Sequence, residues 1–253
     1  TLSESGYEVT VCDGNGNGRF DDPAAVMIPQ GPSSQRIYPK GDYLFLSDRG
    51  QTGQYAAQPL GNMLWLRDRL YWVKLDIAKA TLSLTEFPDG LTPVNLSMAP
   101  DQLTLFEENS GRFVMVHRPA AKTLALPSGQ YRLVSYLAHR RDEKGALWRL
   151  QATGMNLSPE MTVQSGQIAD FPLGEPYTPV ITFPNLGDGR NIPRRVNLNL
   201  NLTGNGKELV TSLTVIEQGK TGKRPSVQFP EKPDYTIIKS DGRLVARGSF
   251  EYG

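Results

Sequence analysis

The sequence predicts an all-β protein made of two or three tandem antiparallel β-sandwich domains. Three observations predict this fold class. Apolar residues recur at every second position in one segment after another, short turn motifs rich in glycine, proline and asparagine separate these segments, and helical periodicity is scarce. Period-two alternation belongs to strands, and frequent turns are typical of sandwiches.

The clearest predicted strand is 196–202, in which valine and leucine alternate with three asparagines. Because successive side chains of a strand point to opposite faces, one face of this segment is apolar and the other is polar. The same period occurs at 7–11, 113–116 and 131–135. We therefore expect half-buried strands in these four segments.

Turn-forming residues connect the predicted strands. Ser240-Asp241-Gly242 lies between the strand-forming segments 235–238 and 244–246, which predicts a hairpin near the carboxyl end. Segment 61–75 is the only candidate helix, yet its aromatic residues fit a strand pair turned at Asp68 equally well. Both interpretations of this segment stay open.

A short internal similarity indicates more than one unit. The segments Pro39-Lys40-Gly41-Asp42-Tyr43 and Pro127-Ser128-Gly129-Gln130-Tyr131 share a Pro-x-Gly-x-Tyr pattern and lie 88 positions apart. We call them the first and second Pro-Gly-Tyr turns. Proline and glycine form a turn, and the tyrosine starts a strand. The spacing is close to the length of one β-sandwich domain.

Length and the repeat together predict the domain organisation. The 253 residues exceed the usual size of a single domain, and three prolines near Glu175 mark a linker or an edge strand. We expect an N-terminal β domain at 1–88, a second β-sandwich at 89–175 and a C-terminal sandwich at 176–253. The chain starts at Thr1 and stops just after a predicted strand, so we expect either a processed or a trimmed amino terminus, and further sequence after residue 253.

Composition excludes several classes of partner. The 27 basic and 26 acidic residues give a net charge of +1, so no global field attracts nucleic acid or an anionic membrane. The densest apolar segment, 60–75, is interrupted by Arg67, Asp68 and Arg69, so no membrane span is expected. Cys12 is the only cysteine, which rules out an internal disulfide and favours a small buried side chain.

The segment 13–22, Asp-Gly-Asn-Gly-Asn-Gly-Arg-Phe-Asp-Asp, places oxygen-bearing side chains at alternate positions with glycines between them. Calcium takes six to eight oxygen ligands, and a tight loop supplies them from alternate residues. Three carboxylates this close would repel one another without a cation. The alternative is a solvated Asn-Gly turn without an ion. The predicted calcium ligands are the side chains of Asp13, Asn15, Asn17, Asp21 and Asp22 and the backbone carbonyl of Arg19.

This loop resembles the EF-hand-like Asp-x-Asn-x-Asn-Gly-x-x-Asp-Asp calcium loops of secreted bacterial multidomain proteins, including the repeat domains of Gram-positive surface adhesins. Position 12 of an EF-hand loop is a bidentate glutamate, whereas this sequence has Ala24 there, so Asp21 or Asp22 must close the site. The Pro-Gly-Tyr turns are similar to segments of prealbumin-like, CnaB-like sandwiches in adhesin stalks and carboxypeptidase regulatory domains. These resemblances imply sandwiches of immunoglobulin-like or prealbumin-like type, with the prealbumin-like one at 89–175. They also imply an extracellular, cell-surface or periplasmic location.

No catalytic centre is predicted. His117 and His139 are the only histidines, and no nucleophile motif accompanies either, so we interpret both as surface residues. Trp65, Trp72 and Trp148 fill a core or, alternatively, line a carbohydrate platform.

We expect a non-enzymatic, calcium-stabilised structural region that contacts other domains of a larger chain or a surface assembly. The alternatives are an accessory domain of a secreted hydrolase and a carbohydrate-binding module. Neither alternative places catalytic residues within this chain.

Overall fold

The computed structural model describes residues 6–20, 22, 25–27, 38–48, 56–119, 121–154, 160–182, 198–217, 226–228 and 230–251. Over these ranges the chain forms strands β1 to β22 and no helix, so the prediction of an all-β protein is confirmed. It follows that the described ranges hold no helix long and apolar enough to cross a membrane.

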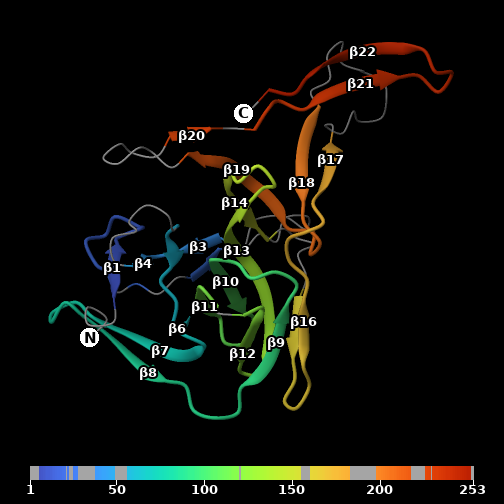
Figure 1. Ribbon diagram of the computed structural model, residues 1–253. Coiled ribbons are helices and arrows are strands. Elements are labelled where there is room, and N and C mark those ends of the chain that lie inside the picture. Colours follow the sequence, from blue (N-terminus) through green and yellow to red (C-terminus); the bar gives the residue numbers. More distant parts are fainter. Residues whose placement is uncertain are drawn as a thin grey trace.

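More than half of the strands form one twelve-stranded sheet, called here the long sheet (Figure 1). Its strands are β6 (Met63–Leu66), β7 (Arg69–Asp76), β8 (Thr81–Glu86), β10 (Gln102–Glu107), β11 (Arg112–His117), β13 (Gly129–Arg141), β14 (Leu147–Thr153), β15 (Glu160–Val163), β17 (Thr178–Thr182), β18 (Asn199–Thr203), β19 (Leu209–Glu217) and β20 (Ser226–Gln228). They pair in the order β17-β18-β19-β14-β13-β10-β11-β6-β7-β8, with β15 on β13 and β20 on β19.

Smaller sheets accompany the long sheet. One is β1-β4-β5 and another is β12-β9-β16, and two further pairs are β2-β3 and β21-β22. Their bounds are β1 Tyr7–Cys12, β2 Ala25–Met27, β3 Tyr38–Lys40, β4 Tyr43–Asp48, β5 Gln58–Pro59, β9 Thr92–Leu96, β12 Thr123–Leu126, β16 Ala169–Phe171, β21 Asp234–Ile238 and β22 Leu244–Ser249.

The two larger of the hydrophobic cores in the described residues lie on opposite faces of the long sheet. Strand β6 is buried throughout, because Met63 and Trp65 face one core and Leu64 and Leu66 face the other. The larger core lies between the long sheet and β12-β9-β16. The smaller one joins β6, β7 and β11 to β1 and β4. A strand covered on both faces has no reason to alternate apolar with polar residues, which explains the continuous apolar run at 63–66.

Several predicted elements are confirmed. For segment 61–75, where a helix and a strand pair both remained open, the structure shows the strand pair β6 and β7. Both residues of its turn, Arg67 and Asp68, have positive φ (52° and 57°), as a tight hairpin turn requires. The predicted C-terminal hairpin is β21-β22. Strand β18 covers part of the predicted strand 196–202, whose first two residues lie outside the described ranges.

Strand pairing is more varied here than in a purely antiparallel sandwich. Strands β6 and β11 pair in parallel, as do β9 and β16, while the other pairings described are antiparallel. The long sheet also contains strands from all three predicted ranges, 1–88, 89–175 and 176–253. The division into domains stays a prediction.

Candidate metal site

The predicted calcium loop begins directly after β1 and is described from Asp13 to Phe20 and at Asp22. Asp21 and Ala24 lie outside the described residues, so the structure gives no geometry for either of them. Strand β1 pairs with β4 along its whole length, from Tyr7 opposite Asp48 to Cys12 opposite Tyr43. The loop therefore leaves the sheet beside the start of β4, where the first Pro-Gly-Tyr turn lies. Cys12, at the junction, is half-buried.

Asp13 organises the first half of the loop by accepting backbone hydrogen bonds. Its Oδ1 accepts from Gly16 N at 2.6 Å and Asn17 N at 3.3 Å, and its Oδ2 accepts from Gly18 N at 2.7 Å. Gly16 and Gly18 have φ of 70° and 78°, a conformation that favours glycine. The bond from Gly18, followed by those from the neighbouring amides, lowers the pKa of the Asp13 carboxyl. Asp13 is therefore held as an anion inside the curled loop.

The two asparagine side chains converge on Asp22. Asn15 Nδ2 and Asn17 Nδ2 donate to Asp22 Oδ2 at 2.9 and 2.5 Å. Their own oxygens accept backbone N–H groups two residues later, Asn17 N at 3.1 Å and Arg19 N at 2.8 Å. The asparagine bonds, followed by the nearby charge of Arg19, lower the pKa of the Asp22 carboxyl. The loop thus closes on itself around Asp22.

The donor set fits a calcium ion in part. Two carboxylates and two amides of the predicted set lie in one closed loop, and these are the hard oxygen donors that calcium prefers. Over the described part of the chain, no group of three or more His, Cys, Asp or Glu side chains is placed to hold a metal ion. Calcium does not need such a group, because amide and backbone carbonyl oxygens complete its coordination. The Arg19 side chain lies 3.8 Å from Asp22, Nε to Oδ1.

Asp42 also contacts the loop, although the loop motif did not predict this contact. It is 0% exposed, and its carboxylate accepts from Gly14 N at 3.2 Å and from Asp22 N at 2.8 Å. Its position inside the first Pro-Gly-Tyr turn gives one signal, because an acidic residue entering a buried strand needs a polar partner.

The histidines require a correction. His117 is buried, with 1% exposure, so the interpretation of His117 as a surface residue is wrong. It lies on β11 against the Tyr7 ring, with ring centroids 5.7 Å apart, and its Nε2 is 3.9 Å from Asp48 Oδ1. Burial lowers its pKa to about 4, against the opposing attraction of Asp48. The neutral imidazole of His117 is therefore part of the buried interior, where Tyr7 of β1 covers it.

His139 is half-buried. Its Nδ1 lies 3.1 Å from Asp101 Oδ2, and the same oxygen accepts the His139 backbone N–H at 2.6 Å. One carboxylate therefore fixes both the main chain and the ring of His139. This arrangement orders the start of β10 against β13.

The three tryptophans occupy different surroundings. Trp65 lies in the larger core with 4% exposure, as the core interpretation predicts. Trp72 packs on Phe87, with centroids 4.7 Å apart, and the Arg112 guanidinium lies 5.1 Å from its ring. Trp148 donates to Asp142 at 3.0 Å. The three rings therefore make separate contacts.

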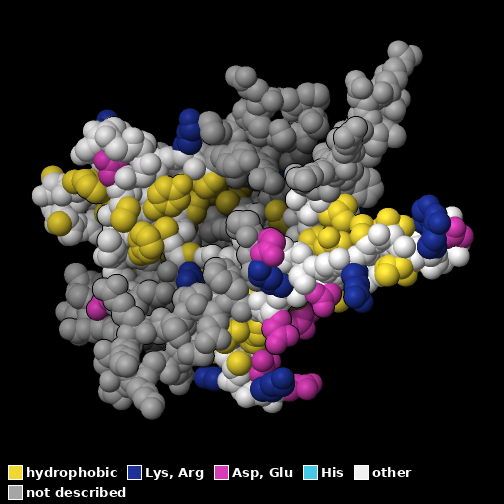
Figure 2. Space-filling model, turned by 90° about the horizontal axis from the view of Figure 1, so that it is seen from above, with side chains coloured by type: hydrophobic (Ala, Val, Ile, Leu, Met, Phe, Trp, Pro, Cys, Tyr) yellow, Lys and Arg dark blue, Asp and Glu magenta, His cyan; other side chains and the backbone are white. Residues whose placement is uncertain are grey.

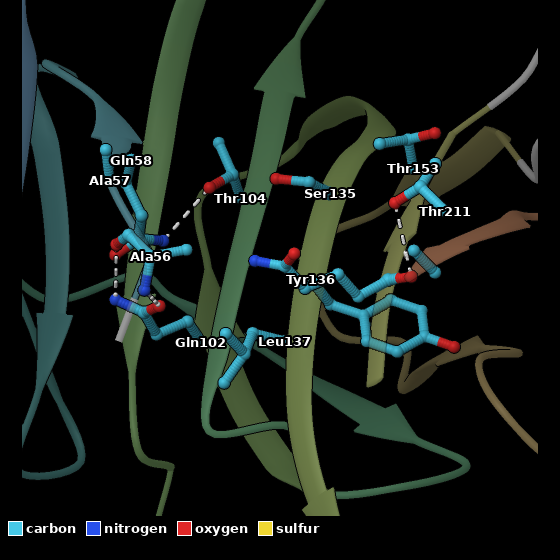
Figure 3. Close-up of a pocket in the computed structure, with 12 residues that line it drawn as sticks. Ala56, Ala57, Gln58, Gln102, Thr104, Ser135, Tyr136, Leu137, Thr153 and Thr211 are labelled. Carbon is cyan, nitrogen blue, oxygen red and sulfur yellow. Dashed lines mark hydrogen bonds between the residues drawn. The ribbon is translucent and has the colours of Figure 1, made fainter. Parts of the chain in front are cut away.

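A small uncharged pocket lies beside strands β10, β13, β14 and β19 of the long sheet (Figure 3). Its volume is about 200 Å³, and uncharged side chains line it. Gln58 Nε2 donates to Leu103 O at 3.0 Å and to Thr104 Oγ1 at 2.9 Å on one side, while Thr153 and Thr211 lie on the other (Figure 3). The lining residues are Ala56, Ala57, Gln58, Gln102, Thr104, Ser135, Tyr136, Leu137, Gln151, Ala152, Thr153 and Thr211.

A second buried carboxylate, Glu208, joins three segments. Its Oε1 accepts from Tyr136 OH at 3.0 Å and from Gly174 N at 2.6 Å, and it is 0% exposed. Tyr136 OH is also 3.2 Å from Tyr177 OH. Burial raises the pKa of both tyrosines, so both phenols stay protonated. Glu208 thereby fastens the β18-β19 turn and segment 172–177 to β13.

An open apolar groove of about 990 Å³ lies between β18-β19 and the C-terminal hairpin β21-β22. The hairpin projects as an arm at the right of Figure 2, where apolar side chains gather along it. Ile238, Leu244 and Val245, near its turn, are each more than half exposed.

Comparisons of the chain with protein-family models, with curated proteins and with solved structures found no match. The fold and the loop geometry therefore carry the functional argument alone.

Proposed function

We propose that this chain is a non-catalytic, calcium-stabilised β-sandwich region of a bacterial extracellular or cell-envelope protein, in which it acts as a spacer, a stalk or an assembly surface. The observation that carries the proposal is the closed loop 13–22, in which Asn15 and Asn17 converge on Asp22 while Asp13 binds three amides of the same loop. Hard oxygen donors at alternate positions of a curled loop suit calcium.

The proposed ligands are the side chains of Asp13, Asn15, Asn17 and Asp22 and the carbonyl of Arg19, with Asp21 as the alternative to Asp22. Rotating each asparagine amide by half a turn exchanges its donor nitrogen for an acceptor oxygen. An ion that attracts these oxygens would replace the N–H groups that now reach Asp22. When bound, calcium would supply the positive charge that neutralises the loop carboxylates.

The ion would stabilise the fold and carry no signal. Extracellular calcium modules bind with Kd of about 10⁻⁴ to 10⁻³ M. At a few mM of free ion, linkage then gives on the order of 1 to 2 kcal/mol. A gain of this size suits a permanent structural ion, because it strengthens the loop wherever calcium is abundant.

Thermal unfolding with and without calcium tests the proposal. For a chain of this length, about 1 kcal/mol corresponds to about 2 to 4 °C in Tm. We expect the Tm to rise by a few degrees in 5 mM calcium, to return in EGTA and to be indifferent to sodium at equal ionic strength. A Tm that calcium leaves unchanged would remove the support for the proposal.

The assembly role is supported by the C-terminal arm. Ile238, Leu244 and Val245 are 58%, 55% and 54% exposed, and contiguous exposed apolar surface marks interaction sites in soluble proteins. An isolated two-stranded hairpin is also marginally stable in water, so contact with a neighbouring domain would stabilise β21-β22.

A carbohydrate-binding module is the second candidate, and the small uncharged pocket in Figure 3 favours it. Amide and hydroxyl side chains such as Gln58, Thr104 and Thr153 suit the hydroxyl groups of a neutral sugar. The volume of about 200 Å³ lies below the usual range of about 300 to 1,000 Å³ for ligand sites, which ranks this candidate second. A glycan array that retains a neutral sugar on the wild type and loses it on Thr153→Val would favour it.

A further inference from the structure

We propose that Asp42 is the positioning residue of the calcium loop: one buried carboxylate joins the two ends of the loop and thereby sets its affinity for the ion. This inference rests on the proposed calcium function. Asp42 is not one of the proposed ligands, and it lies twenty residues beyond the end of the loop in sequence.

The two oxygens of Asp42 serve opposite ends of the loop. Oδ1 accepts the Gly14 N–H at 3.2 Å, one residue after the first predicted ligand, and Oδ2 accepts the Asp22 N–H at 2.8 Å, at the last. The distance between Asp13 and Asp22 is therefore fixed through one side chain. Fixing ligand positions before the ion arrives reduces the entropy lost on binding.

The main chain of Asp42 is itself well held. Asp42 N donates to Asp22 O at 3.2 Å, so Asp42 is bonded to Asp22 through its backbone as well as through its side chain. Asp42 O accepts from Leu60 N at 2.8 Å, and β4 starts at the next residue. Leu44 and Leu60 both belong to the smaller core. Asp42 therefore holds the loop in a fixed position relative to that core.

Gly14 shows how closely the loop packs on the first Pro-Gly-Tyr turn. A Cβ atom at Gly14 would lie 2.2 Å from Gly41 O and 2.6 Å from the Tyr43 ring. Only glycine leaves room for this approach. The Tyr43 hydroxyl donates to Pro39 O at 3.4 Å, so the ring that lies over Gly14 is itself tied to the turn.

A carboxylate is the side chain that this position requires. Both amides that approach Asp42 are donors, so two acceptor oxygens are needed. An asparagine offers one acceptor oxygen and one N–H₂ group, and the N–H₂ group would face a donor. The Asp42→Asn variant therefore loses one of the two bonds while keeping the volume of the side chain.

The chain contains a matched control in Glu107. This carboxylate is 7% exposed and accepts from Asn109 N at 3.0 Å and Ser110 N at 2.7 Å, so it also holds two amides of one turn. It lies beside Gly129 of the second Pro-Gly-Tyr turn, where a Cβ atom would lie 2.9 Å from its Oε1. Glu107→Gln makes the same chemical change as Asp42→Asn at a turn that is not part of loop 13–22.

Calorimetric titration of calcium into the wild type, Asp42→Asn and Glu107→Gln tests the inference. Loss of a residue that supports metal ligands typically costs about 10- to 100-fold in metal affinity. We expect that loss for Asp42→Asn and a Kd within about twofold of the wild type for Glu107→Gln, although both variants should unfold at lower urea concentration. Asp42→Asn that folds and binds calcium with the wild-type Kd would overturn the inference and leave the proposed function standing.

A measurement on the calcium-free wild type needs no variant. In hydrogen exchange, the Gly14 and Asp22 amides, which bond to a buried carboxylate, should be protected more strongly than the Gly16 amide, which bonds to the half-exposed Asp13. Equal exchange at the three amides would overturn the inference. Wild-type protein that binds no calcium, with Gly14 and Asp22 protected, would contradict the proposed function and reduce Asp42 to a structural residue.

Discussion

Tyr131 donates a hydrogen bond of 2.9 Å to the carbonyl oxygen of Pro127, four residues earlier. Tyr43 makes the same bond to Pro39, at 3.4 Å. Each tyrosine stands at or near the start of a strand, β13 or β4, and each bond closes a Pro-Gly-Tyr turn. The internal similarity therefore corresponds to one local structure formed twice. Such a bond resembles the tyrosine corner of Greek-key sandwiches, in which a hydroxyl bonds to backbone a few residues upstream.

Tyr131→Phe should destabilise the protein, because Tyr131 is fully buried and its hydroxyl satisfies a backbone carbonyl. The expected loss is about 1 kcal/mol in the free energy of unfolding. Urea denaturation of Tyr131→Phe and Tyr43→Phe measures it. The Tyr43 variant should lose less, because its bond is longer and Tyr43 is partly exposed. Wild-type stability in Tyr131→Phe would show that the hydroxyl contributes nothing.

Glu208 and Tyr136 should be energetically coupled, because the Tyr136 hydroxyl and Gly174 N–H bond the same carboxylate oxygen. A double-mutant cycle with Tyr136→Phe and Glu208→Gln should give an interaction energy within the range of about 0.5 to 3 kcal/mol seen for residues in contact. The measurement is the urea dependence of tryptophan fluorescence for the four proteins. Strictly additive losses would refute the coupling.

Acid should weaken the fold through His117. Its pKa is about 4 in the folded state and about 6.5 when exposed, so between these values only the unfolded chain holds the proton. Stability therefore falls as the pH falls from about 6.5 to about 4, by on the order of 3 kcal/mol at most. Unfolding midpoints at pH 7 and pH 5 should differ less in His117→Gln than in the wild type. An equal difference in the wild type and in His117→Gln would show that other groups cause the fall in stability with pH.

The stabilisation by calcium should disappear in acid. Backbone and asparagine hydrogen bonds lower the pKa of Asp13 and Asp22, so both carboxylates stay ionised to below their usual range of about 4. Their contribution is present above the unfolded pKa and is lost as the pH falls through the folded values. Proton competition should therefore remove the calcium-dependent rise in Tm only as the pH falls through the lowered pKa values of Asp13 and Asp22 in the folded protein. A rise that persists at a pH where NMR titration shows both carboxylates protonated would place the ion at another site.

Period-two alternation predicted which segments are strands but not their partners. Side chains at 61–75 fit two strands with a turn at Asp68 as well as a helix, and nothing in them shows that β6 pairs in parallel with β11, about fifty residues later. The burial of His117 escaped prediction for the same reason, since Tyr7 covers it from β1. Local sequence indicates the propensity to form a strand and which side chains share a face of it, whereas long-range strand pairing depends on the whole chain.

The candidate site likewise has one part that the sequence predicted and one part that it did not. Asp13, Asn15, Asn17 and Asp22 are close in sequence, so their spacing alone predicted that they gather. Asp42 reaches the loop only because β1 and β4 pair from end to end. That contact could not be read from the loop motif.

The most direct test is a high-resolution crystal structure of the protein grown in several mM calcium. The account predicts one ion with oxygens of Asp13, Asn15 and Asn17 at about 2.3 to 2.6 Å, together with a carboxylate from Asp21 or Asp22. It also predicts that Asp42 keeps its bonds to Gly14 and Asp22. A map with no ion, in which the asparagine amides still donate to Asp22, would contradict the central claim.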